Sequence, residues 1–320
     1  MLTIHSPNPA MPPQPWQTGA ASPQTPPMWL DLTDPSEDER RHAESLLGTT
    51  LPTRDQTSAI EASSRLRSAD RILRLNIPAF VRADGGQGAM TPLAFVLTPE
   101  LLATVRYADS VAFRHVAETL GKEDAPRNSV DTFVALIEAI VNVGADRMEA
   151  VAADLSKLSR SVFLDSRDHR RQLRGALFKV GAMQRQITQV RSALLGVSRI
   201  VGYLCEVNPA WMGTPAHVQL KTVHTDVASL SEFDQQLNDR LQFLLDAVLG
   251  FINNDQNDIM KVLTVITVVT IPPMILAGIW GMNFKSIGEY DWPHGYAFGL
   301  SMIFLSMVLP LIWFRWKRWF

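Results

Sequence analysis

The stretch VLTVITVVTIPPMILAGIWGMNF, residues 262–284, decides the fold of this chain because it runs for 23 residues without a charged side chain. A second uncharged stretch of 20 residues, GYAFGLSMIFLSMVLPLIWF, covers residues 295–314. The hydrocarbon core of a bilayer is about 30 Å thick, and about 20 helical residues cross it. We therefore predict a transmembrane hairpin, with a first span at about 260–281, an external loop at 282–294 and a second span at 295–314.

The charges beside these stretches predict the orientation of the hairpin. Arg315, Lys317 and Arg318 follow the second stretch, and basic residues favour the cytoplasmic side of a membrane. We expect a multi-pass protein of the cell (inner) membrane with both termini in the cytoplasm. Two helices buried in a soluble protein are the alternative, but two full-length stretches joined by a short loop and ending in basic residues disfavour it. The single Cys205 excludes an internal disulfide and agrees with a reducing compartment.

Two transmembrane helices alone cannot enclose a pathway for a solute. A lone helical pair has no interior that shields polar atoms from lipid. If these helices carry a solute, several identical subunits must surround it, and one helix from each copy then lines a central pore. The formal net charge of −2 gives no indication of nucleic acid binding, so the expected partners are identical subunits, the lipid bilayer and the solute.

The part before the hairpin divides into a short tail and a large domain. Residues 1–27 contain eight prolines and no charged residue, a composition that we interpret as a disordered tail. Residues 28–256 are expected to form an α+β cytoplasmic domain, in which an α/β unit is followed by long helices. Strands are predicted at 28–32, 72–82 and 93–97, and residues 101–107 form either a further strand or the start of a helix.

Helix boundaries in this domain are marked by caps and by apolar periodicity. Asp34 is expected to cap a helix, with Pro35 at the first helical position and Glu37 reaching back to the cap. Long helices are predicted at 130–163, at 169–205 and from about residue 215 onward.

The last of these helices is expected to be a stalk that continues into the first span, because no proline falls between Pro215 and Pro272. Its apolar residues recur every seven positions, which is coiled-coil-like spacing. They are Val223, Leu230, Leu237, Leu244 and Phe251, with Val227, Leu241 and Val248 at a second seam position that Asp234 and Asp255 interrupt.

Charge is segregated between two of the helical segments. Residues 160–199 contain nine basic and two acidic residues (9 − 2 = +7), and residues 221–258 contain two basic and seven acidic residues (2 − 7 = −5). One interpretation is that neighbouring helices attract each other. The other is that Asp226, Asp234 or Asp255 binds regulatory divalent cations between subunits.

The corner after the first span carries a recognisable tripeptide, Gly281–Met282–Asn283. It lies inside NDIMKVLTVITVVTIPPMILAGIWGMNF (257–284), a short loop follows, and the chain ends in RWKRWF. This C-terminal part of about 64 residues resembles the CorA family of magnesium transporters, and the resemblance continues at Glu289, Trp292, Gly295 and Tyr296. The rest of the chain agrees only in its order of elements and in short pieces such as WLDL and FVLTPELLATVR.

The resemblance implies a homopentameric channel in which the first span lines the pore and the second faces lipid. Family members move Mg²⁺, and often Co²⁺ or Ni²⁺, down the electrochemical gradient. Gly281, Met282 and Asn283 would then form the outer selectivity site, and Glu289 would lie in the external loop. The implied pore-lining residues are Asn257, Met260, Leu263, Thr267, Ile271, Met274 and Gly278. Mg²⁺ would be the transported and possible regulatory ion, and no organic cofactor is expected.

Three departures from the family pattern leave alternatives open. Met274 stands where threonine is usual, and Lys285 stands where an acidic residue is frequent. The basic bias of residues 160–199 is also unexpected, because these helices are acidic in some relatives. The related ZntB zinc transporters usually carry valine in the middle of the tripeptide, so Met282 favours magnesium. His217 and His224 lie seven residues apart and either favour a softer metal or are two solvated stalk histidines.

A second alternative is a membrane cation sensor that transports nothing. An enzyme is not expected, because the chain has no GxxxxGK[ST] loop, no HExxH signature and no nucleophile–base pattern.

Overall fold

The structure, a computed structural model, describes residues 1–7, 13–16, 25–58, 66–69, 71–82, 88–120, 122, 125–164, 169–282, 292–317 and 319. Two compact units make up the chain. The first comprises Met1–Leu164 and Ala176–Leu244, and the second comprises Asp165–Gly175 and Leu245–Phe320. The predicted fold class is confirmed. A sheet with flanking helices is followed by long helices, and the last long helix and the C-terminal helix are each apolar and long enough to span a membrane.

A seven-stranded sheet is the centre of the first unit. Its strands are β1 (Leu2–His5), β2 (Gln14–Pro15), β3 (Trp29–Thr33), β4 (Leu66–Ala69), β5 (Ile72–Arg82), β6 (Gly88–Leu97) and β7 (Leu102–Arg106). They lie in the order β2-β1-β3-β7-β6-β5-β4. Only β3 and β7 pair in parallel, and every other pair of neighbouring strands is antiparallel. The strands predicted at 28–32 and 72–82 are confirmed, the one predicted at 93–97 is the second half of β6, and residues 101–107 form a strand rather than a helix start.

Both faces of the sheet contribute to the core. Successive side chains of a strand point to opposite faces, and helices pack against each face. One face packs against α1 (Glu37–Leu47) and includes Leu30, Leu32, Ala94 and Val96. On the other face, Phe95 contacts Phe113 of α4 (Val111–Thr119) and Phe133 of α5 (Ser129–Leu164), with ring centroids 6.4 and 5.3 Å apart. The short α2 (Arg54–Ser58) lies near β5 and β6.

The prediction of a disordered tail at residues 1–27 is wrong for the described part of that segment. β1 lies inside the sheet between β2 and β3, and Leu2 and Ile4 are buried in the core. The prolines fall outside β1, and Pro15 lies in β2 at the sheet edge, where its missing N–H costs no ladder bond. Composition averaged over 27 residues concealed a four-residue strand with two apolar core residues, Leu2 and Ile4.

The first helix begins two residues later than predicted. Ser36, not Asp34, is the N-cap, and its hydroxyl accepts a hydrogen bond from the Glu39 N–H while the Glu39 carboxylate accepts one from the Ser36 N–H. Asp34 has a left-handed backbone (φ 43°), and its N–H donates to the Arg106 carbonyl of β7. That hydrogen bond to the sheet holds Asp34 outside the helix.

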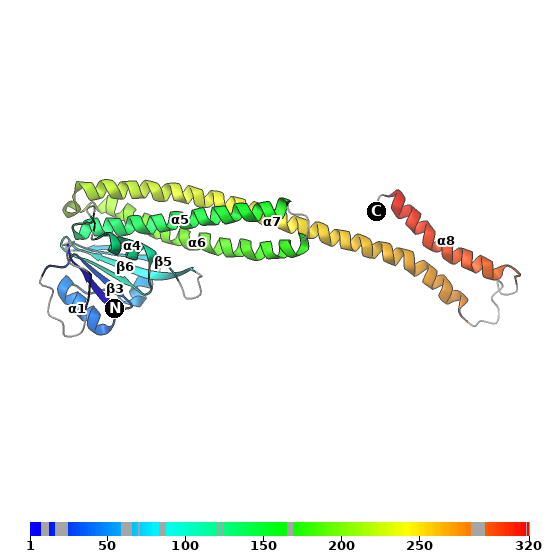
Figure 1. The fold of residues 1–320 in the computed structure, drawn as a ribbon, viewed down its shortest axis with the longest axis horizontal. Coiled ribbons are helices and arrows are strands. Elements are labelled where there is room, and N and C mark those ends of the chain that lie inside the picture. Colours follow the sequence, from blue (N-terminus) through cyan, green and yellow to red (C-terminus); the bar gives the residue numbers. More distant parts are fainter. Residues whose placement is uncertain are drawn as a thin grey trace. The chain divides into compact units, whose positions relative to one another are not determined.

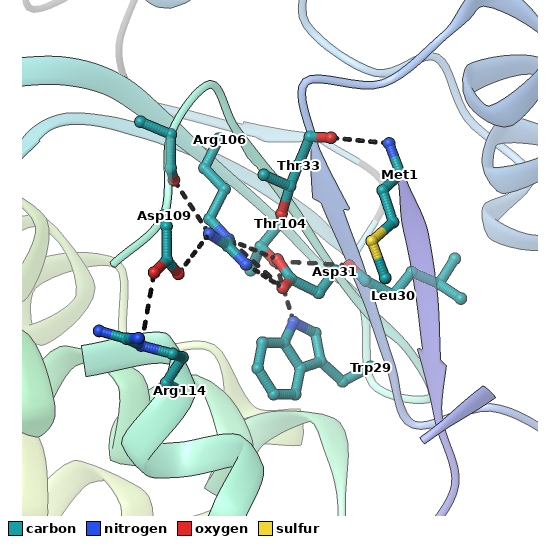
Figure 2. Close-up of polar contacts among 10 residues, drawn as sticks. Met1, Trp29, Leu30, Asp31, Thr33, Thr104, Arg106, Asp109 and Arg114 are labelled. Atoms are coloured by element: carbon teal, nitrogen blue, oxygen red, sulfur yellow. Dashed lines mark hydrogen bonds and ion pairs between the residues drawn. The ribbon is translucent and has the colours of Figure 1, made fainter. Parts of the chain in front are cut away.

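A buried polar network joins β3 to β7 (Figure 2). The Arg106 guanidinium donates to both carboxylate oxygens of Asp31 at 2.7–3.3 Å, and its Nη1 donates to the Ala108 carbonyl. The Trp29 indole N–H donates to the Thr104 hydroxyl, which itself donates to Asp31. The network satisfies a charge that β3 carries into the core, because a buried charge is costly unless it is paired.

Long helices complete the chain: α5, α6 (His169–Val207), α7 (Gly213–Trp280) and α8 (Gly295–Trp316), with the short 3-10 turn η1 (Ala210–Met212) before α7. The predicted long helices are confirmed to within a few residues. Figure 1 shows α5, α6 and the first part of α7 side by side. The predicted seam is confirmed at Val223, Val227, Leu237, Leu241, Leu244 and Val248, which are buried. Leu230 and Phe251 are half-buried.

Candidate ion pathway

The apolar part of α7 is the candidate pore helix. The helical segment Ala210–Trp280 and helix α8 are each long and apolar enough to cross a membrane, and few residues in their apolar windows are buried within the chain. Pro272 and Pro273 lie inside α7 without ending it. Because proline has no N–H, the carbonyls of Val268 and Val269 lose their usual partners one turn along the helix.

The residues predicted to line the pore share one exposed side of α7. At about 100° per residue, the six from Met260 to Gly278 fall within an arc of about 80°, and Asn257 lies about 40° outside it. All seven are exposed in the single chain, and Met274 is 64% exposed. They are Asn257, Met260, Leu263, Thr267, Ile271, Met274 and Gly278.

The opposite side of α7 contacts α8 at Trp280. Val265, Leu276 and Trp280 lie about half a turn from the pore-lining residues, and all three are less exposed. The Trp280 ring packs over Gly299, where an added Cβ would lie 3.6 Å from it. The side with the predicted pore-lining residues is therefore available to another molecule, as are other exposed residues around this part of α7.

Between Met260 and Gly278, one polar oxygen interrupts the apolar side chains of the predicted pore-lining set. The Thr267 hydroxyl donates its proton to the Leu263 carbonyl at 2.8 Å. Its oxygen lone pairs stay free to accept hydrogen bonds from the water around an ion. Leu263, Ile271 and Met274 provide no such oxygen, so rings of these side chains would be dry constrictions.

The helix ends in the tripeptide that the sequence singled out. The Gly281 N–H donates to the Ala277 carbonyl at 2.9 Å, and the Met282 N–H donates to the Ile279 carbonyl at 3.3 Å. Met282 is exposed. Asn283, Lys285 and Glu289 lie outside the described residues, so their predicted roles stay predictions.

Sequence reasoning missed a groove beside this end of the helix. It has a volume of about 570 Å³ and is lined by residues of the two spans, among them Trp280, Trp292, Tyr296 and Gly299. The available signal was the spacing of Gly295 and Gly299, which lie one turn apart on α8 and leave room for a large ring on α7.

The three carboxylates predicted as regulatory ligands do not come together within one chain. Asp226 and Asp255 lie about 12 Å and 32 Å along α7 from Asp234, at about 1.5 Å per residue. Asp234 is buried and accepts a 2.5 Å charge-assisted hydrogen bond from Arg191 of α6, so a cation there would have to displace a guanidinium. No three His, Cys, Asp or Glu side chains form a metal-sized group among the described residues. The Arg191–Asp234 pair agrees with attraction between the basic and acidic helices.

The two stalk histidines do not form a shared site. The His217 Nδ1 lies 2.7 Å from the Gly213 carbonyl of its own helix, and His224 is exposed one heptad further on. Seven residues correspond to about 10 Å along a helix, too far for both imidazoles of one chain to hold a single metal ion at about 2 Å.

Comparison with known proteins identifies the family. Residues 26–318 match the family described as "CorA-like Mg2+ transporter protein", which is nearly the whole chain. The chain belongs to the CorA-like Mg²⁺ transporter family. CorA-like proteins are transporters and not enzymes, and this membership confirms the prediction that the chain is not an enzyme.

Similar proteins agree with membership of the CorA family. The chain is 28% identical over 293 residues to the magnesium transport protein CorA of Escherichia coli K12, covering 91% of this chain and 92% of the relative. It is 29% identical over the same length to that of Salmonella typhimurium LT2. The complete CorA structure from Methanocaldococcus jannaschii matches with a TM-score of 0.76 at 15% identity, over 100% of this chain and 99% of that one.

Two further structures share the CorA fold. The full-length CmaX protein has a TM-score of 0.71 at 17% identity and covers 99% of this chain and 97% of its own. The cytoplasmic domain of ZntB from Vibrio parahaemolyticus has a TM-score of 0.53 at 14% identity and covers 80% of this chain and 96% of its own. At these identities the likeness concerns the fold alone.

Proposed function

We propose that this chain assembles into a homopentameric channel in the cell (inner) membrane and carries Mg²⁺ into the cytoplasm, with Co²⁺ and Ni²⁺ as further cargo. The single observation that carries the proposal is the match to the CorA-like family over residues 26–318, which includes both predicted spans. In this arrangement α7 lines the pore, α8 faces lipid, and both termini lie in the cytoplasm.

The exposed side of α7 supports the proposal. A membrane-spanning helix that packs with one side on its own hairpin partner has its other side free for other subunits or for a pore. The Thr267 hydroxyl bonds to its own helix carbonyl, and its remaining lone pairs can accept hydrogen bonds. Around a pore, the same oxygen faces water and hydrated ions. Several copies are required because two helices cannot enclose a pathway.

The proposed outer site has the chemistry that a hydrated dication needs. Mg²⁺ gives up its water reluctantly, so a ring of neutral oxygens from Asn283 and the Gly281 carbonyl suits a hydrated ion better than a tight carboxylate cage. Such oxygens accept hydrogen bonds from coordinated water, which the ion's charge makes a stronger donor. A neutral ring also releases the ion more readily than a charged one.

The membrane potential provides enough energy for uptake. A dication gains about 4.6 kcal/mol per 100 mV, twice the value of about 2.3 for a unit charge. At 1.36 kcal/mol per decade, this supports an inward concentration ratio on the order of 10³. Uptake therefore needs no ATP.

Zinc transport and cation sensing without transport are the competing functions. Met282 in the middle of the tripeptide favours Mg²⁺ over Zn²⁺. The position of the His217 Nδ1 near its own helix carbonyl also weakens the case for a softer metal site in the stalk. Ion flux measurements separate the three functions directly.

The test is Asn283→Ala in proteoliposomes that contain a Mg²⁺-sensitive dye, with an inside-negative potential set by K⁺ and valinomycin. We expect uptake to be lost while the oligomer stays intact, because Asn283 would contact the ion rather than a neighbouring helix. The matched control is Asn254→Ala, the same substitution on α7 at an exposed position on the side of Val265.

Three results would contradict the proposal. Unchanged Mg²⁺ flux in Asn283→Ala would show that Asn283 does not form an outer site for the ion. Flux of Zn²⁺ but not Mg²⁺ through the wild type would favour a zinc transporter. A conformational response to Mg²⁺ without any flux would favour a sensor.

A further inference from the structure

Two polar contacts in the helical bundle show which residues of α6 and α7 lie at the same height. The two helices run antiparallel, and Arg191 of α6 contacts Asp234 of α7 while Gln184 contacts Asn238. Moving eight residues along α6 from Arg191 reaches Arg199, and moving eight residues back along α7 from Asp234 reaches Asp226. Both steps correspond to about 12 Å. Arg199 and Asp226 are therefore level with each other.

These two level residues face different sides of the bundle. Both are exposed, and neither forms an ion pair with another residue among those the structure describes. On α7, Asp226 is turned by about 80° from Asp234 and interacts electrostatically with Glu138 of α5. On α6, Arg199 is turned by about 80° from Arg191, away from the packed core.

The flank at Asp226 carries carboxylates. Glu138 lines an open groove of about 730 Å³ together with Asp131 and Asn142. Burial, and secondarily the Asp226 carboxylate, raises the pKa of Glu138. Lys122 also lines this groove, yet it forms no ion pair with Glu138 within the described part of the chain. Two neighbouring carboxylates without a cation repel each other.

The flank at Arg199 is basic in turn. Arg185 lies two heptads before Arg199 on the same exposed side of α6, and it too is exposed and without an ion pair among the described residues. One side of the bundle thus presents carboxylates, and another presents guanidinium groups, of which that of Arg199 is level with Asp226.

We infer that Arg199 of one copy docks against the Asp226–Glu138 carboxylates of the next copy, and that this contact joins neighbouring subunits around the ring. The inference rests on the proposed oligomer. Copies related by rotation about an axis along the helices share the same heights, so residues that are level within one chain are level between chains. A contact between two different flanks is heterologous, which is the type that closes a ring. Opposite charges at matching heights also fix the register of the two bundles.

Disulfide crosslinking tests the contact in the full-length chain. In a Cys205→Ser background, Arg199→Cys and Asp226→Cys are combined, and the protein is oxidised in membranes. A disulfide forms only when the two Cα atoms come within about 7 Å. We expect a ladder of covalent oligomers that reducing agent removes. The matched control pairs Arg185→Cys with Asp226→Cys, because 199 − 185 = 14 residues displaces the first cysteine by about 21 Å. A ladder with both pairs, or with neither, overturns the inference.

Charge reversal gives a second measurement that does not depend on cysteine chemistry. Arg199→Glu should lower the fraction of oligomer at least several-fold on dilution in detergent, as measured by native mass spectrometry. Adding Asp226→Arg should restore it, because the pair is rebuilt with its signs exchanged. No restoration, with the double variant folded by circular dichroism, contradicts the contact. A wild type that is monomeric and inactive refutes the proposed function, whereas an active oligomer without the crosslink refutes only this interface.

Discussion

Replacing Arg106 by methionine should destabilise the first unit strongly. The side chains of Arg106 and Asp31 are 11% and 8% exposed, and the guanidinium provides three of the hydrogen bonds to that carboxylate. Methionine keeps an apolar stem near the Phe113 ring, over which the guanidinium lies at 5.2 Å, but leaves Asp31 with the Thr104 hydroxyl as its remaining side-chain donor. Removing one partner of a buried ion pair costs about 3–5 kcal/mol.

This loss should be visible as a change in melting temperature. For a unit of this size, each kcal/mol shifts Tm by about 2–4 °C, so Arg106→Met should lower it by about 6–20 °C. The measurement is thermal unfolding of the full chain in detergent, followed by near-UV circular dichroism. The matched control is Arg41→Met, whose partner Asp38 and own side chain are 56% and 73% exposed. Exposed pairs contribute below about 1 kcal/mol.

A double replacement separates the ion pair from simple packing. Arg106→Met combined with Asp31→Leu removes both charges, and exchanging both partners for apolar groups is often neutral or stabilising. We expect this variant to recover much of the lost Tm. The reasoning about an unpaired buried charge is wrong if Arg106→Met and Arg41→Met have the same Tm. It is also wrong if the double replacement has a lower Tm than Arg106→Met alone.

Three further predictions concern the core and the spans. Burial against Trp29 lowers the pKa of His5 from 6.5 to about 4, so between pH 7.5 and 5 the unfolded state alone gains a proton and stability should fall by about 2 kcal/mol. His5→Phe should flatten this pH dependence in unfolding titrations, and an unchanged slope would exclude His5 as its source. Met274→Thr should raise Mg²⁺ flux in proteoliposomes by wetting an apolar ring, whereas reduced flux would contradict that role. Gly299→Ala should be tolerated, since its Cβ would make ordinary contact with Trp280 at 3.6 Å. Gly299→Leu should separate the spans and lower the yield of folded protein, so equal yields of the two variants would show that the contact is dispensable.

Part of the fold follows from the sequence because it depends on local patterns. The span lengths at 262–284 and 295–314 reflect how far an apolar helix must run to cross a bilayer, and no distant residue changes that. The heptad spacing of Val223, Leu237 and Leu244 likewise identified the buried side of α7, since a helix repeats its faces at a fixed interval. The pore-lining set was carried over from the family resemblance, and its spacing agrees with one exposed side of the same helix.

The sequence failed where a residue's environment came from far along the chain. Asp34 and Ser36 are both good helix caps, and a hydrogen bond from Asp34 to Arg106 of β7 decides between them. Leu2 and Ile4 of β1 became part of the core because β3 offers this strand an unpaired edge, which no average over a proline-rich segment reveals.

The sequence by itself determined the two apolar stretches long enough to span a membrane, the long helices and the position of the tripeptide, because length, periodicity and a motif are properties of contiguous residues. Only the tertiary structure decided which charges find partners. Asp234, predicted as a possible metal ligand, is held by an arginine 43 residues away, while the Asp226 carboxylate, after burial, contributes to the raised pKa of Glu138. A carboxylate's role depends on which side chains packing brings within a few ångströms of it, and one-dimensional spacing does not contain that distance.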